Sequence, residues 1–185
     1  NWRRDYFPQY KANRRKGREE SSFDWAEAFR IMHLVKDEIK ENLPYKVLHV
    51  DKCEADDIIG TLVEHTQQFG QFQKVMIVSS DHDFKQLQKW DNVSQFSPMT
   101  KKYVEESHPR QNLKLKILQG DAGDGVPNVL SHDDTFVNND RQTPLSKKKK
   151  LAILQDLSEG ELLYAASWYR NYQRNEKLIY LPVPP

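Results

Sequence analysis

The strongest constraint on the fold is an apolar, mostly β-branched run at residues 74–78, Lys-Val-Met-Ile-Val, which ends shortly before Asp81. Such a run is typical of a strand buried on both faces of a sheet. Helical periodicity over residues 54–69 precedes it, and a short apolar run at 45–50 predicts an earlier strand. Strand, helix and strand with short connections indicate a parallel α/β unit with right-handed crossovers.

Other patterns divide the chain into two regions. Apolar residues at three- and four-residue steps predict a helix over 22–43, and weaker strands are predicted over 93–96 and 103–104. Helices are also predicted near 110–118, 145–157 and 159–176. We therefore expect an α/β core over residues 1–118 and a helical region over 119–185.

Composition excludes several classes of protein. A chain of 185 residues suits one domain of ordinary size, and no stretch of it approaches the roughly 20 apolar residues that span a bilayer. The single Cys53 excludes an internal disulfide and a multi-cysteine zinc site. We expect no membrane association and an intracellular, reducing environment.

Positive charge is concentrated at the N-terminus. Residues 1–18 contain seven Arg and Lys residues against Asp5, although the whole chain has a net charge of +1. The remainder is therefore acidic. A basic arm beside an acidic body suits a polyanion held next to bound cations. A solvated, arginine-rich helix explains the charge equally well.

Three acidic groups follow predicted strand or helix boundaries. Glu54, Asp56 and Asp57 open the helix at 54–69, where one acid is explained by helix capping but three exceed that need. In the parallel unit, Asp51 and Asp81 are expected at the carboxyl edge of the sheet, where ligands collect.

The second and third acidic groups have simple structural explanations when taken alone. Strand alternation points Asp81 and Asp83 the same way; the alternative is a strand-to-helix turn in which Asp83 caps a helix at Phe84 to Leu87. The segment 120–127, which contains Asp121 and Asp124, is by itself a turn. Together the groups suggest hard oxygen ligands for Mg²⁺ or Mn²⁺. Two such ions about 3.5–4 Å apart could clamp the attacking and leaving oxygens of a phosphodiester.

These motifs resemble those of the 5′-nuclease superfamily in letters, order and spacing. The matching segments are Glu54-Ala-Asp-Asp57-Ile-Ile, Ser-Ser-Asp81-His-Asp83-Phe and Gly120-Asp121-Ala-Gly-Asp124-Gly-Val-Pro. The N-terminal segments Trp2-Arg3-Arg4-Asp5 and Tyr10-Lys11-Ala-Asn-Arg14 resemble the basic segment after the second aspartate motif of the family. The segments Ser97-Pro98-Met99 and Lys101-Lys102-Tyr103-Val104 bring the chain closest to the T-even phage branch.

The resemblance implies a parallel-sheet, PIN-like α/β core, two Mg²⁺ ions (or Mn²⁺) and a basic arch over residues 1–20. The implied metal ligands are Glu54, Asp56, Asp57, Asp81, Asp83, Asp121 and Asp124. The implied catalytic residues are Asp81, Asp83, Lys11 and Arg14. The implied nucleic-acid contacts are Arg3, Arg4, Lys11, Arg14, Arg15, Lys16, Arg18, Lys147 and Lys148. Tyr6 and Tyr10 could stack on bases or pack in the core.

Two departures from the family pattern change what we expect. The family has earlier strands that end in two further aspartates, so we expect N-terminal strands to be missing from this chain. Either the sequence is a fragment, or the missing piece is another chain, or the protein does not cut. After Pro127 the chain lacks the glycines of the usual helix-hairpin-helix, so we expect an atypical DNA-binding region over 119–185. Lys147 and Lys148 could grip duplex phosphate there, or simply form a solvated face.

Three functional hypotheses follow. The first is a metal-dependent 5′-3′ exonuclease or flap endonuclease acting on DNA or RNA–DNA 5′ ends during phage replication, in the cytoplasm of an infected bacterium. A single-strand-binding protein or a clamp would be candidate partners. The second hypothesis is a non-hydrolytic DNA-binding remnant of the family. The third, an acidic protein-binding scaffold, leaves the clustered carboxylates unexplained.

Overall fold

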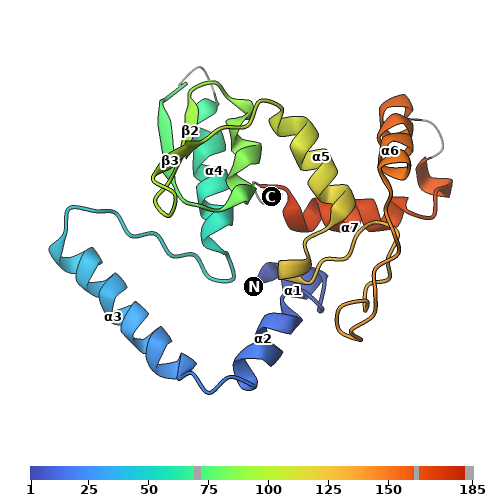
Figure 1. The fold of residues 1–185 in the computed structure, drawn as a ribbon. Helices are drawn as coiled ribbons and strands as arrows, with labels where there is room; N and C mark the ends of the chain where they lie inside the picture. The colour runs from blue at the N-terminus through green and yellow to red at the C-terminus, as the bar shows by residue number, and fades with distance from the viewer. Residues whose placement is uncertain (69–71, 161–162, 182–185) are drawn as a thin grey trace.

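A three-stranded sheet lies at one side of the molecule (Figure 1). In this computed structural model, which describes residues 1–68, 72–160 and 163–181, the strands are β1 (Val75–Val78), β2 (Val93–Ser97) and β3 (Lys102–Val104). β1 pairs with β2 in parallel, and β2 pairs with β3 in antiparallel. The predicted strands at 74–78, 93–96 and 103–104 are thus present, in a mixed rather than wholly parallel sheet.

Helices make up most of the remaining structure. The α-helices are α1 (Trp2–Tyr6), α2 (Ala12–Glu19), α3 (Trp25–Asn42), α4 (Ala55–Gln67), α5 (Pro109–Gln119), α6 (Lys147–Glu159) and α7 (Tyr169–Ile179). Short 3₁₀ helices are η1 (His82–Lys89), η2 (Ala122–Asp124) and η3 (Leu163–Ala165). No helix within the described ranges is both long and apolar enough to cross a membrane.

Four of the predicted helices, at 22–43, 54–69, 110–118 and 145–157, are confirmed as α3, α4, α5 and α6. Phe69, at the end of the second of these predictions, lies outside the described residues. The helix predicted over 159–176 is wrong in the described residues 163–168, because α7 begins only at Tyr169; residues 161–162 of this prediction lie outside the described residues. Before it, Ala166 N donates to Leu163 O and Tyr169 N to Ala166 O at 3.0 Å, a tighter turn that ends beside the buried Trp168.

The strand predicted at 45–50 is wrong. The segment is extended but finds no partner strand among the described residues, and Tyr45, Leu48 and Val50 are each at least half exposed. Without pairing partners, apolar periodicity is not enough to make a strand. Asp51 consequently does not lie at the sheet edge, and its side chain is fully exposed.

The prediction that the run at 74–78 is buried on both faces is also wrong. Ile77 is 5% exposed, whereas Met76 and Val78 are 54% and 63% exposed. β1 is an edge strand of the sheet, and within the described chain only the face that carries Ile77 is covered. The other face leaves its apolar residues in contact with solvent.

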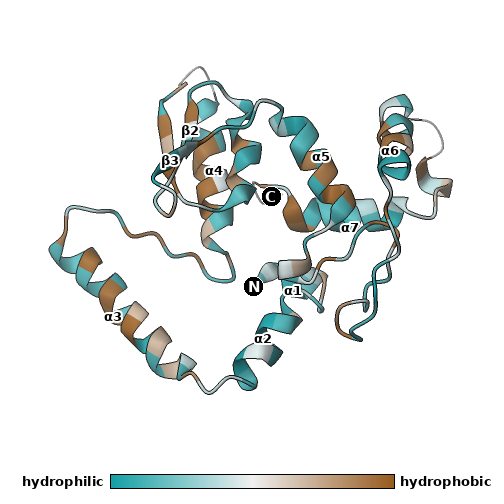
Figure 2. Cartoon of the chain, viewed as in Figure 1, coloured by the Kyte–Doolittle hydropathy of each residue, from teal (hydrophilic) through white to brown (hydrophobic). Residues whose placement is uncertain are grey.

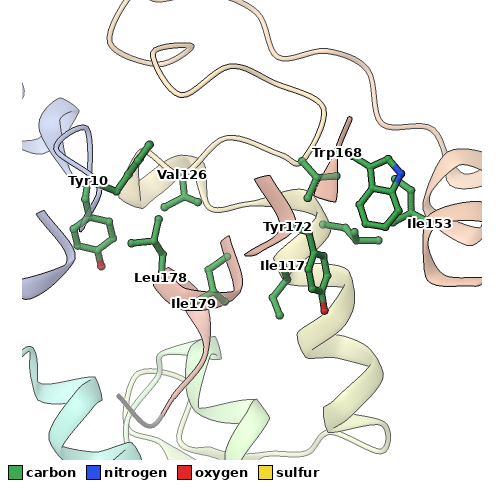
Figure 3. Close-up of a cluster of buried hydrophobic side chains, with 11 residues drawn as sticks. Tyr10, Ile117, Val126, Ile153, Trp168, Tyr172, Leu178 and Ile179 are labelled. Carbon is green, nitrogen blue, oxygen red and sulfur yellow. The ribbon is translucent and has the colours of Figure 1, made fainter. Parts of the chain in front are cut away.

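Two apolar cores hold the fold together. The smaller lies under the sheet and includes Val63, Ile77 and Phe84. The larger joins the N-terminal segment to the C-terminal helices: Figure 3 shows Tyr10 beside Val126 and Leu178, with Trp168 and other side chains farther along the same cluster. This core spans both of the predicted regions, so residues 1–11 fold against residues far away in the sequence.

The chain between α1 and α4 leaves the body as a wide excursion (Figure 1). It consists of α2, α3 and the extended segment that returns to α4, and neither α2 nor α3 has a buried residue. α3 forms because Asp24 accepts a hydrogen bond from Glu27 N at 2.9 Å and caps a well-patterned helix. Figure 2 shows that α2 is mostly hydrophilic, whereas α3 carries many hydrophobic residues.

A buried ion pair ties the N-terminus to the body. Arg3 is 2% exposed, and its Nη1 and Nη2 lie 2.8 and 2.6 Å from the two carboxylate oxygens of Asp57. Its Nε donates to Leu178 O at 2.8 Å. A single guanidinium therefore joins α1 to α4 and α7.

A second buried arginine anchors the irregular segment between α5 and α6. Arg174 donates from Nη1 to Asp133 Oδ1 and, at 2.9 Å, from Nη2 to Pro127 O. The neighbouring Asn175 donates to Ile117 O at 2.8 Å and to Pro127 O at 2.9 Å. Helix α7 thus provides donors for the Pro127 carbonyl of this segment and for the Ile117 carbonyl near the end of α5.

We expect Asp57→Asn to lower the free energy of unfolding by about 3–5 kcal/mol, because it removes the hydrogen-bonded counterion of the buried Arg3 and leaves only Glu54 Oε2, 3.8 Å from Nη1. Urea denaturation measures the change. The matched control is Asp5→Asn, since Asp5 pairs with Lys52 at 3.0 Å on the surface and both side chains are about two-thirds exposed. An Asp57→Asn midpoint equal to that of the control would contradict the structural role of the pair.

Acid should remove the contribution of Asp133 to stability. Burial raises the pKa of this carboxyl, but hydrogen bonds from Arg170 and Arg174 outweigh it and leave the pKa below its usual 3.8. The stabilisation is therefore present above the unfolded-state pKa and lost as the pH falls through the lower folded-state value. The stability difference between wild type and Asp133→Asn should be full at neutral pH and vanish in strong acid, as measured by urea midpoints across pH. A pH-independent difference would contradict this assignment.

Candidate active site

Five carboxylates from three distant segments line one small cavity. They are Glu54, Asp56, Asp83, Asp121 and Asp124. The cavity measures about 10 Å³, the space of about one water molecule. The sequence places these acids up to 70 residues apart, and the fold brings them to one place.

The first acidic group is divided by the way helix α4 begins. Glu54 and Asp57 form a reciprocal capping box, in which Glu54 N donates to Asp57 Oδ2 at 2.9 Å. Asp57 is thereby turned into the protein, where it meets Arg3 and where Trp2 Nε1 donates to it at 3.1 Å. Glu54 and Asp56 remain on the cavity side. Both the capping and the cavity interpretations of this motif therefore apply: Asp57 only caps the helix, Asp56 only lines the cavity, and Glu54 does both.

The second group lies beyond the end of its strand. β1 ends at Val78, so the expectation that strand alternation aligns Asp81 with Asp83 is wrong. Asp81 instead caps η1 and accepts a hydrogen bond from Asp83 N at 2.9 Å. Asp83 lines the cavity, whereas Asp81 is exposed and is not part of the lining.

The third group forms a tight turn that requires glycine. Gly120 has a φ of 70°, and a Cβ there would lie 2.3 Å from Val126 O. Asp121 N donates to that same carbonyl at 2.8 Å, while its side chain accepts from Asp124 N at 3.1 Å. This closed turn presents both aspartates to the cavity.

Two predicted cations of the basic arm reach the acids. Lys11 Nζ lies 2.5 Å from Glu54 Oε1 and 3.6 Å from Asp124 Oδ2, and Arg14 Nη2 lies 2.7 Å from Asp124 Oδ1. Lys11 adopts a left-handed conformation with φ of 56°, and its backbone N donates to Asp124 O at 2.7 Å. The turn between α1 and α2 is thus fixed against the acidic loop.

Two further residues that the sequence did not single out for this site complete it. Tyr10 Oη lies 3.0 Å from Glu54 Oε2 and 2.7 Å from Asp124 Oδ2; burial, followed by the charge of Asp124, raises the Tyr10 pKa, so the phenol stays protonated. Lys116 in α5 contacts Asp83 and lies 3.3 Å from Asp121 Oδ2. The sequence indicated this role of Lys116 only weakly, by placing it five residues before Asp121 in the last turn of a predicted helix.

Asp56 is the member of the group whose charge is least compensated. Burial, followed by repulsion from Asp81 and Glu54, raises its pKa, and no hydrogen bond or ion pair to its side chain occurs within the described residues. Clustered carboxylate oxygens around an ion-sized space fit a hard divalent cation in their chemistry. In the side-chain positions described for residues 1–68, 72–160 and 163–181, however, no three acidic, His or Cys side chains converge on one point.

The remaining predicted basic contacts are distributed differently. Arg3 is buried against Asp57, so it has a structural partner in place of the expected phosphate. Arg15 and Lys16 are exposed on α2, 3.8 and 4.0 Å from Glu19 and Glu20. Arg4 is exposed beside Tyr10 O, Arg18 lies over aromatic rings, and Lys147 and Lys148 open α6, away from α2 and α4 (Figure 1).

Comparisons of the sequence identify relatives. The family model described as "5′-3′ exonuclease, N-terminal resolvase-like domain" matches residues 1–114. Ribonuclease H of Enterobacteria phage T4 is 41% identical over 98% of this chain, and the 5′-3′ exonuclease of Buchnera aphidicola subsp. Schizaphis graminum is 34% identical over 70% of it. The alignments cover 61% and 44% of those proteins, so the chain spans about half of the length of these relatives.

The fold has solved counterparts. The T5 5′-exonuclease with bound divalent zinc superimposes with a TM-score of 0.70 at 20% identity, covering 98% of this chain and 70% of that one. This likeness concerns the fold, a mixed α/β arrangement with a small sheet and many helices. Together with the family match over more than half of the chain, it leads to one conclusion: the chain belongs to the 5′-3′ exonuclease family of the 5′-nuclease superfamily.

Proposed function

We propose that this chain carries the active site of a metal-dependent 5′-3′ exonuclease or flap endonuclease that hydrolyses phosphodiesters at DNA or RNA–DNA 5′ ends. The observation that carries the proposal is that five carboxylates from three distant segments line one small cavity, with Lys11 and Arg14 beside them. The names of the relatives, a ribonuclease H and 5′-3′ exonucleases, support the same class of reaction.

Glu54, Asp56, Asp83, Asp121 and Asp124 are the residues that would hold Mg²⁺ or Mn²⁺, with Asp81 as a further candidate beside them. Bound divalent ions supply an activated water and stabilise the leaving oxygen of a phosphodiester. A relative in fold, the T5 5′-exonuclease, has been solved with divalent zinc. Asp57 is a weaker candidate than the sequence indicated, because both of its oxygens face Arg3.

The protein side chains position the scissile phosphate and compensate its charge. Lys11 and Arg14 lie at the acids but keep donors to spare, so they can bind a non-bridging phosphate oxygen. Tyr10 Oη lies within hydrogen-bond distance of both Glu54 and Asp124 and donates its single proton to one of these carboxylates at a time. The exposed cations of α2 extend the basic surface away from the cavity and would contact flanking phosphates.

The wider role is proposed by analogy. Removal of RNA primers and 5′ flaps during phage replication fits the relatives, and a single-strand-binding protein or a clamp would be a natural partner. A non-hydrolytic DNA-binding remnant remains the second candidate. The observation that favours it is that the cavity acids of the described chain are paired with Lys11, Arg14 and Lys116 rather than arranged around one point.

Asp124→Asn should abolish Mg²⁺-dependent cleavage, because it removes a charge that both Lys11 and Arg14 face. The measurement uses the protein that carries this chain and a 5′-labelled flap duplex, with Mg²⁺ or with EDTA. Binding of the duplex in EDTA should persist. Asp140→Asn, an exposed aspartate in the loop before α6, is the matched control and should cut normally. Binding without Mg²⁺-dependent cleavage by the wild type would instead favour the remnant.

Lys116→Met should tighten divalent-ion binding several-fold, because the ammonium neutralises Asp83 and Asp121 and competes with a cation for them. Calorimetric titration with Mn²⁺ in the absence of nucleic acid measures this separately from catalysis. Lys114→Met, an exposed lysine in the same helix, should leave the affinity unchanged. Equal affinities in all three proteins would show that Asp83 and Asp121 do not bind the ion.

A further inference from the structure

A second and much larger cavity lies between η1, α5 and α7. Its volume is about 710 Å³, within the range of about 300–1,000 Å³ that is typical of small-molecule sites. None of its described lining residues also lines the small cavity of the five carboxylates. The end of α7 contributes to both: Lys177 and Tyr180 line the larger cavity, whereas Leu178 and Ile179 line the smaller one. The larger cavity is therefore a separate feature of the fold.

The walls of the larger cavity are held together by buried side chains. Gln86 is 7% exposed; its Nε2 donates to Ile179 O at 3.1 Å, and its Oε1 accepts from Leu181 N at 2.8 Å. These two hydrogen bonds fix η1 to the end of α7. The fully buried Asn175 joins α7 to α5, because it donates to Ile117 O at 2.8 Å. The cavity is thus shaped by the packing of the protein itself.

Helix α5 lines the cavity with an apolar and a cationic stripe. Four of its residues, at steps of three and four, lie on one face of the helix and line the cavity: Arg110, Leu113, Lys114 and Ile117. Tyr172 of α7 lies beside Ile117 in the larger core (Figure 3). A flat apolar group therefore finds an apolar wall, and two cations stand next to that wall.

Positive charge exceeds negative charge around the cavity. Lys89 and Lys177 add to the two cations of α5, whereas Glu176 is the one carboxylate among the described lining residues. Lys89 Nζ lies 4.0 Å from Glu64 Oε1, at the limit of an ion pair. The other three cations form no ion pair with any residue that the structure describes. An anion in this cavity therefore meets donors whose charge is not already neutralised.

We propose that this cavity binds a nucleoside phosphate, with its base on the apolar wall of Leu113 and Ile117 and its phosphates on Arg110 and Lys114. The class of ligand follows from the combination of a flat apolar space with concentrated positive charge, since cationic side chains make strong hydrogen bonds to phosphate. This site goes beyond the proposed function and takes no part in phosphodiester hydrolysis.

The backbone around the cavity distinguishes this ligand from an extended acidic peptide. Such a peptide gains affinity by pairing its backbone with a free strand edge. None of the described lining residues belongs to a strand, and the backbone groups inside α5 and α7 already bond within their helices. A nucleotide carries its ring and its charge in one compact molecule and needs no backbone pairing. Peptide binding is therefore an outcome of the test.

The test is a calorimetric titration with ADP of the protein that carries this chain. EDTA is present, so that no metal ion bridges the nucleotide to the carboxylates. Adenosine and pyrophosphate should each bind at least about tenfold more weakly than ADP, because neither occupies both the apolar wall and the cations. Lys114→Met should weaken ADP binding about tenfold and leave adenosine binding unchanged. Leu113→Ala should weaken the binding of both ADP and adenosine.

Lys74→Met is the matched control, because Lys74 is exposed and lies just before β1, outside the cavity lining. It should bind ADP as the wild type does, and circular dichroism checks that each variant is folded. The proposal would be overturned by a lack of ADP binding at millimolar concentration, or by equal ADP affinities in the wild type, Lys114→Met and Leu113→Ala. Pyrophosphate, or a capped tripeptide of two aspartates around a phenylalanine, binding as tightly as ADP would also overturn it.

Discussion

The buried pairing of Arg3 with Asp57 is the interaction on which the rest of this structure depends. Neither charge would be tolerated alone in the interior, so the N-terminal segment and the start of α4 must fold together or not at all. The Nε contact of Arg3 with Leu178 O extends the constraint to α7. Because Asp57 is fixed inside, Glu54 and Asp56 are left at the cavity, and Tyr10 and Lys11 arrive beside them. The site is therefore a consequence of how one arginine is buried.

Charge compensation governs the site itself. Several carboxylates in a partly buried place repel one another, which is visible in the raised pKa of Asp56, caused first by burial and then by the charges of Asp81 and Glu54. Three cations compensate this negative charge: Lys11 and Arg14 from the basic arm, and Lys116 from α5. These contacts decide the electrostatic balance of the cavity.

The excursion of α2 and α3 differs from the body in the burial of its apolar residues. The body buries its apolar residues in two cores, whereas α3 carries an apolar pattern without any buried residue. Helix formation there is supported by capping and periodicity, and its exposed side chains are available to a ligand.

The sequence by itself determined most helices, the three strands of the sheet and the identity of the acidic motifs, because periodicity, capping residues and glycine turns act over a few residues. It misassigned residues 45–50 and the burial of Met76, since both depend on whether a neighbouring strand covers them. The resemblance placed Asp57 and Arg3 among the site residues, and the structure pairs them with each other in the interior; the sequence did not point to Lys116 as a partner of the acids. Only the tertiary structure decided those roles, because contacts between residues far apart in the chain depend on long-range packing that no local spacing encodes.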